Sequence, residues 1–133
     1  MKIILDVNVI LSALIRDSTT RKIILNSQFD FYFPEPSLHK IRKYKDYILE
    51  KSGLSEEEYN KIMEILFKYL KLVPTEEIVK NWDEAKKIME HIDPEDVVFI
   101  ATALGIHDSV IWSDDRHFEK QDKIKTLKTE DVI

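Results

Sequence analysis

The chain has no cysteine, only two glycines and no surplus of basic residues. The lack of cysteine excludes disulfides and zinc–thiolate sites. The scarcity of glycine argues against a glycine-rich loop that cradles phosphates. Directly after Met1 and Lys2 the sequence enters a short strand-like run, which fits neither a signal peptide nor a membrane span. We therefore expect a cytoplasmic protein that makes no membrane contact.

The composition is that of a globular domain. Apolar residues make up 44% of the chain. Charged residues make up 34%, above the ~25% of an average domain. A length of 133 residues suits a single domain with a proper core, which we assign to residues 1–133.

The formal net charge of −5 argues mildly against nucleic-acid binding, because nucleic-acid-binding proteins usually carry a basic face. Residues 39–45 are an exception, since the segment His-Lys-Ile-Arg-Lys-Tyr-Lys is basic and contains an aromatic ring. This segment is either a nucleic-acid contact or a solvated helix face.

Apolar periodicity predicts strands that alternate with helices. Runs typical of strands occupy residues 2–5, 29–33, 72–74, 110–112 and 125–127. Helical spacing or helix start signals mark residues 8–16, 19–25, 37–51, 55–70, 75–91 and 97–104. This order predicts an α/β fold, a three-layer α/β/α sandwich with a mainly parallel central sheet.

Three aspartates stand at the edges of apolar runs. Asp6 ends the first strand, Asp96 lies in the first turn of a helix, and Asp115 follows the strand at 110–112. Buried charges need partners, and parallel sheets bind ligands beyond the carboxyl ends of their strands. The partner that suits several carboxylates is a hard divalent cation such as Mg²⁺ or Mn²⁺. The three residues therefore indicate a metal-dependent enzyme that acts on phosphodiester bonds.

Each aspartate also has a simpler explanation. Asp6 could cap the helix that follows it, although Asn8 could do so instead. Asp96 could balance the helix dipole, although Glu95 offers the same charge. Asp115 could belong to an ordinary acidic turn with Asp114.

The segments around these aspartates resemble the motifs of the PIN-domain nucleases. Residues 3–12 carry an acid at the strand end followed by Asn8 and Ser12. Residues 96–104 resemble the second motif, an Asp before an Ala-rich helix, and residues 113–118, Ser-Asp-Asp-Arg-His-Phe, resemble the third. In order and spacing the resemblance covers nearly the whole chain.

The resemblance implies a ribonuclease that uses Mg²⁺ or Mn²⁺ to cut single-stranded RNA, and many small family members are toxins of toxin–antitoxin pairs. The implied catalytic and metal-binding residues are Asp6, Asp96 and Asp115, with Asp114 as a further metal ligand. The groups expected to position substrate or support the ligands are Asn8, Ser12, Lys40, Asp93, Ser113 and Arg116. Further phosphate contacts are expected from Arg16, Arg42 and Lys43. The expected protein partners are a second copy of the chain and an antitoxin.

One position departs from the family pattern. A fourth acid, usually a Glu early in the helix after the second strand, falls on Lys40, and neither Glu35 nor Glu50 is in register. A cation at this place would leave one weakly held metal and reduced activity. Alternatively, the Lys40 side chain reaches out to solvent or to a substrate phosphate.

Two other functions stay open. Lys40 and the negative net charge favour a non-catalytic module that binds RNA or protein, and the intact aspartates disfavour it. A metal-dependent phosphatase lacks support because the chain has no glycine-rich loop. The helices at 55–70 and 75–91 either only close the core or also receive a second copy or an antitoxin.

Overall fold

A parallel sheet forms the centre of the computed structural model, which describes residues 1–15 and 18–133. Arg16, an expected phosphate contact, lies outside the described residues. Within them the strand order is β3-β2-β1-β4-β5, and each recorded pairing is parallel. The strands are β1 Lys2–Leu5, β2 Asp30–Pro34, β3 Leu70–Val73, β4 Ser109–Trp112 and β5 Thr126–Leu127. The predicted α/β/α fold with a mainly parallel sheet is confirmed.

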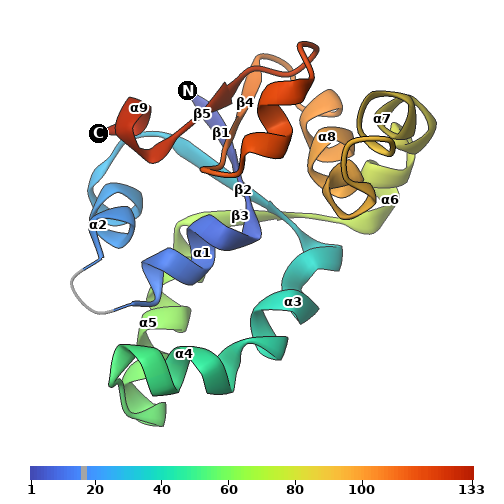
Figure 1. Ribbon diagram of the computed structural model, residues 1–133. Helices are drawn as coiled ribbons and strands as arrows, with labels where there is room; N and C mark the ends of the chain where they lie inside the picture. Colours follow the sequence, from blue (N-terminus) through green and yellow to red (C-terminus); the bar gives the residue numbers. More distant parts are fainter. Residues whose placement is uncertain (16–17) are drawn as a thin grey trace.

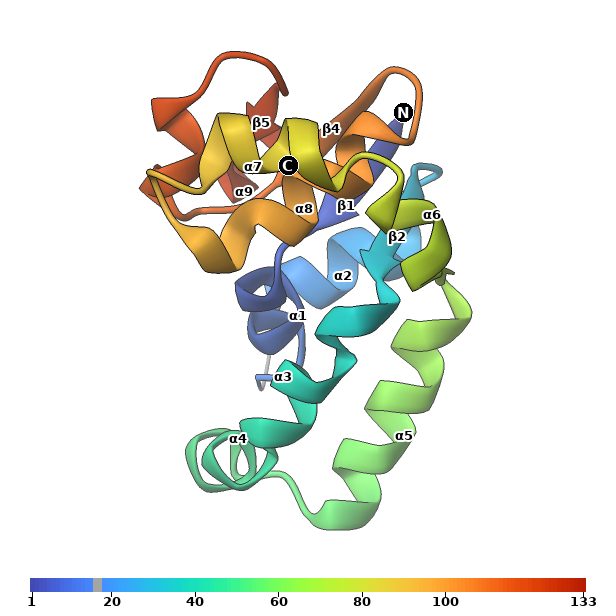
Figure 2. The same cartoon turned by 90° about the vertical axis from the view of Figure 1, so that its right-hand side faces the viewer.

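Helices cover both faces of the sheet (Figure 1). On one side lie α1 Val7–Ala13, α2 Thr19–Asn26, α3 Leu38–Lys43, α4 Lys45–Ser52 and α5 Glu56–Lys68. On the other lie α6 Thr75–Val79, α7 Trp82–Met89 and α8 Val97–Leu104. The side changes because the chain moves outward from β1 to β3 and then returns to β4 on the far side of β1, with right-handed crossovers. Figure 2 shows α4 and α5 extending away from the sheet.

Two predicted helices are interrupted. The helix expected at 37–51 consists of α3 and α4, because Tyr44 between them has φ −96° and ψ 7°. The helix expected at 75–91 consists of α6 and α7, with Asn81 at φ −114° before α7. Apolar side chains recur on both sides of each break, so periodicity alone predicted continuous helices. Short 3₁₀ turns η1 Glu35–Ser37, η2 Pro94–Asp96 and η3 Arg116–Lys120, and the final helix α9 Thr129–Val132, complete the described elements.

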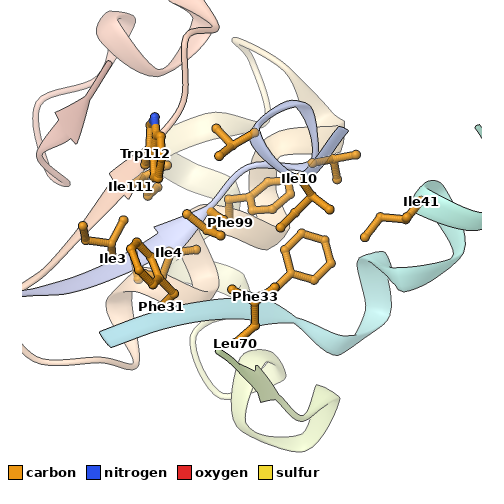
Figure 3. Close-up of a cluster of buried hydrophobic side chains, with 14 of the residues drawn as sticks. Ile3, Ile4, Ile10, Phe31, Phe33, Ile41, Leu70, Phe99, Ile111 and Trp112 are labelled. Atoms are coloured by element: carbon orange, nitrogen blue, oxygen red, sulfur yellow. The ribbon is translucent and has the colours of Figure 1, made fainter. Parts of the chain in front are cut away.

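Buried aromatic rings join the sheet to the elements that carry the predicted site (Figure 3). Phe33 of β2 packs against Phe99 of α8 with ring centroids 6.4 Å apart. Phe99 in turn meets Phe118 of η3 edge to face at 6.2 Å. Phe31 lies 6.2 Å from Trp112 at the end of β4. This packing fixes α8 and η3 against the carboxyl ends of the central strands.

Within residues 1–15 and 18–133, no helix has the length and apolar character needed to cross a bilayer.

The two glycines provide a test of the backbone. Gly53 ends α4 with φ 69°, a left-handed conformation that costs little only for glycine, whereas Gly105 ends α8 with φ −83°. We expect Gly53→Ala to reduce the free energy of unfolding by about 1 kcal/mol in urea titrations. Gly105→Ala is the matched control. Its added Cβ would meet the side-chain amide of Asn81 at 3.2 Å, and the backbone oxygens of Thr102 and Ala101 at the ordinary contact distances of 3.6 and 3.8 Å. An equal or larger loss for Gly105→Ala would contradict the assignment.

Candidate metal centre

The predicted site lies where the sheet topology reverses. β1 and β4 are neighbours, although the chain visits β2 and β3 between them. Open α/β sheets bind ligands at the carboxyl edge of such a switch point. A pocket of about 130 Å³ opens here, lined by Asp6, Val7, Asn8, Lys40, Tyr44, Asp93, Glu95, Asp96, Phe99 and Asp115. We call it the acidic pocket.

Asp6 is held out of water at the end of β1. Its residue is only 4% exposed, and its side chain makes no capping hydrogen bond to α1. Instead Ser113 donates to Asp6 Oδ2 at 2.7 Å, and the same hydroxyl accepts from the Asp115 amide at 3.0 Å. Burial raises the pKa of Asp6, the Ser113 hydrogen bond opposes the rise, and the Asp115 charge adds to it. The backbone groups of Val7 and Asn8 also lower the pKa, so Asp6 is near the first turn of α1, but its one side-chain partner is Ser113.

The Asp96 side chain does not cap a helix either. Asp93 accepts the Glu95 amide at 2.9 Å and so caps the turn before α8, while Asp96 makes no capping bond. Asp96 is 8% exposed, and its Oδ2 is buried without a hydrogen-bond partner among the described residues. Burial, followed by the charges of Asp6, Asp93 and Asp115, raises its pKa to about 7.

His117 enters the cluster, although sequence reasoning did not select it. Its Nδ1 lies 2.9 Å from Asp93 Oδ2, 3.2 Å from Asp115 Oδ1 and 3.5 Å from Asp96 Oδ2. This nitrogen is buried, and none of these approaches has hydrogen-bond geometry. One ligand atom each from Asp93, Asp96 and His117 lies within 4.8 Å of the others. The signal in the sequence was an imidazole two residues after Asp115.

Lys40 lies at the edge of the acidic pocket. It projects from α3 into the lining, and its Nζ is 3.9 Å from Glu95 Oε2. Glu95 has an 81% exposed side chain, so this ion pair is weak and accessible to solvent. Lys40 thus brings positive charge to the pocket from the helix after the second strand.

The other predicted residues divide into two groups. Asn8 lines the acidic pocket, and Ser113 is buried beside Asp6. Ser12 and Arg116 are exposed and do not belong to the lining.

Asp114 requires a correction. Both of its carboxylate oxygens accept hydrogen bonds from Thr129, from the amide at 2.8 Å and from the hydroxyl at 2.6 Å. The Thr129 hydroxyl also accepts from Trp112 Nε1 at 3.0 Å. Asp114 therefore anchors the start of α9 and does not belong to the lining of the acidic pocket.

A sequence model of the PIN domain matches residues 4–132. The chain belongs to the PIN-domain family. This finding confirms the resemblance of the three motifs, and it indicates a nuclease-type function with a divalent metal, since PIN domains are generally nucleases. A search among curated proteins finds no match.

The residues of this PIN domain fit a divalent cation. The acidic pocket offers hard carboxylate oxygens, the donors that suit Mg²⁺ and Mn²⁺, and the His117 imidazole lies close to three of these carboxylates. Asp96 Oδ2 and His117 Nδ1 are buried polar atoms that lack hydrogen-bond partners within the described residues. Such atoms are costly unless something satisfies them, and a cation between them would do so.

The raised pKa of Asp96 predicts a pH-dependent stability of the metal-free protein. Asp96 loses its proton near pH 7 when folded but near its ordinary value of 3.8 when unfolded. The folded state therefore binds the extra proton between these values, and stability falls as pH rises through this window. We expect Asp96→Asn to remove this loss, stabilising the protein at pH 8 by on the order of 1–2 kcal/mol and having little effect at pH 4.

The measurement is urea unfolding in EDTA at both pH values. Asp122→Asn, an exposed carboxylate far along the chain from Asp96, is the control and should change neither curve. An Asp96→Asn effect that is the same at pH 4 and pH 8 would refute the assignment.

Proposed function

We propose that this PIN domain is an endoribonuclease that requires Mg²⁺ or Mn²⁺ and hydrolyses phosphodiester bonds of single-stranded RNA. The observation that carries the proposal is the meeting of Asp6, Asp96 and Asp115 in one small pocket, although they come from three distant segments. Two of these residues are nearly fully buried, where unpaired negative charge is unfavourable. Such a cluster is retained at a cost in stability, which suits a binding site better than a structural role.

The proposed roles follow from the positions of the side chains. Asp6, Asp96 and Asp115 would hold the ion, with Asp93 and His117 beside them. A bound ion would supply Lewis-acid stabilisation of the phosphate and lower the pKa of a water. Ser113 fixes Asp6 relative to the Asp115 backbone through its two hydrogen bonds, and so sets the spacing of two ligands.

Polar and basic groups at the pocket support RNA as substrate. Asn8 and Lys40 line the acidic pocket and would contact the phosphate that is cut. Arg42 and Lys43, exposed on α3, would contact flanking phosphates. These contacts imply binding that weakens as salt increases.

Substitution of Asp115 tests the proposed nuclease activity directly. We expect Asp115→Asn to lower cleavage of a labelled single-stranded RNA in Mn²⁺ by about 100-fold or more, because one ligand loses its charge. Circular dichroism should show a folded protein. EDTA should abolish the wild-type reaction.

The neighbouring residue supplies the matched control. Asp114→Asn should lower the melting temperature, since it weakens the contacts to Thr129, but it should leave cleavage near the wild-type rate. The proposal fails if Asp115→Asn cuts as well as the wild type.

We also propose that Lys40 leaves room for only one weakly held ion. Its positive charge lies at the pocket where the family resemblance implies an acid. Lys40→Glu is therefore expected to tighten Mn²⁺ binding about tenfold or more by calorimetry, from the reversal of one nearby charge. Lys43→Glu makes the same charge change on the exposed side of α3 and should have little effect. The proposal for Lys40 is wrong if the wild type binds Mn²⁺ with micromolar affinity and Lys40→Glu does not change that affinity.

Lys40 also supports the second candidate function, a catalytically weakened domain that binds RNA or protein. In that case the wild type would bind RNA but cut none with either metal, and Lys40→Glu would not restore cleavage.

We propose a second copy of the chain and an antitoxin as protein partners, mainly because the family resemblance implies them. A homodimer is supported by β3, an edge strand that exposes Leu72 and offers unpaired backbone groups. The toxin role would be supported by a neighbouring gene for a small DNA-binding antitoxin, and a monomeric protein with no such neighbour would oppose both proposals.

A further inference from the structure

An apolar groove of about 490 Å³ adjoins the acidic pocket. Its apolar lining includes Pro36, Val79, Trp82 and Val98, from η1, α6, α7 and α8. Two residues, Lys40 and Glu95, line both the groove and the acidic pocket. We call it the Trp82 groove. The two hollows are therefore neighbours, with the Lys40–Glu95 ion pair at their boundary.

This arrangement has the chemistry of a nucleotide. A nucleotide joins a flat, largely apolar base to a charged phosphate. The two hollows join an apolar surface with an aromatic ring to a pocket in which Lys40, and a cation bound by the carboxylates, would attract a phosphate. Aromatic side chains beside a phosphate-binding surface are the common platform for unpaired RNA bases. A volume of several hundred Å³ is that of sites for small organic ligands.

We propose that the Trp82 groove binds the base of the nucleotide adjacent to the scissile phosphate. The proposal rests on the ribonuclease function and adds a site that selects unpaired RNA, since a base can enter the groove only when it is unstacked from its neighbours. Lys40 would lie between the bound base and the acidic pocket. Its weak pairing with exposed Glu95 at 3.9 Å leaves its ammonium free to exchange to an RNA phosphate.

A protein segment is a less suitable occupant. An apolar protein segment could fill the Trp82 groove but would leave the adjacent acidic pocket unused. A nucleotide would occupy both hollows. The lysine at the boundary also suits a phosphate linked to the base.

The chain carries its own reporter for this site. It has two tryptophans, and Trp112 is fully buried, so a soluble quencher such as acrylamide mainly reaches Trp82. We would measure acrylamide quenching in EDTA with a short single-stranded oligoribonucleotide, and with the same oligonucleotide made abasic throughout. We expect the first to reduce the quenching constant at least twofold and the second to leave it nearly unchanged. Equal protection by both, or by neither, overturns the proposal.

Groove variants provide the second measurement. Val79 is 56% exposed, so Val79→Glu should fold while placing a charge in the groove. We expect it to weaken binding of labelled RNA in EDTA about tenfold, in the range of one lost base-stacking contact. Ile65→Glu, at a 44% exposed position on α5 outside the groove, is the matched control and should bind like the wild type. Trp82→Phe keeps a ring and should lose less than Trp82→Ala.

The outcomes separate this proposal from the ribonuclease function, because the binding assays need no metal. Base-dependent protection without RNA cleavage in any metal would support the groove and overturn the nuclease. Cleavage by the wild type with no effect of Val79→Glu or of removing the bases would overturn the groove and leave the nuclease standing.

Discussion

Repulsion among carboxylates that are held out of water is the constraint on which the site depends. Asp6 and Asp96 are almost fully buried, and burial raises the pKa of both. The charge of Asp115 adds to the rise at Asp6, and the charges of Asp6, Asp93 and Asp115 add to it at Asp96. The parallel pairing of β1 with β4 fixes the first acid, and the contacts of Phe99 with Phe33 and Phe118 fix α8 behind the second. The packed core thus holds the Asp6 and Asp96 carboxylates close together in spite of their repulsion. A cation is the simplest partner that turns this unfavourable arrangement into a favourable one.

Two nitrogen-bearing side chains border the cluster of carboxylates. His117 brings an imidazole nitrogen among three carboxylates, and Lys40 brings an ammonium to the pocket edge. The Lys40 charge offsets part of the negative charge that would hold a metal. The expected result is a centre with modest metal affinity, in which Lys40 is better placed to meet the substrate phosphate than to bind the ion.

Much of the fold could be predicted because its signals are local. Examples are the Ser55 capping box before α5, the left-handed Gly53 after α4 and the Asp93-Pro94 turn before α8. The breaks at Tyr44 and Asn81 could not be predicted, since they depend on how each half-helix packs and leave no mark on apolar periodicity.

The site shows the same limit. Asp6, Asp96 and Asp115 are recognisable by chain order at strand ends, but only tertiary geometry separates Asp115 from its neighbour Asp114, which turns to Thr129. His117 and the Trp82 groove come from contacts between elements far apart in sequence. The position of His117 two residues after Asp115 was the one local signal, and the groove left none.

The most direct test of the metal centre is anomalous diffraction from crystals of the wild-type protein soaked in Mn²⁺. The predicted result is one peak in the acidic pocket, bound by Asp96 and by at least one of Asp6, Asp93 and Asp115. A pocket without a peak at millimolar Mn²⁺, with the His117 imidazole hydrogen-bonded among the carboxylates, would contradict it.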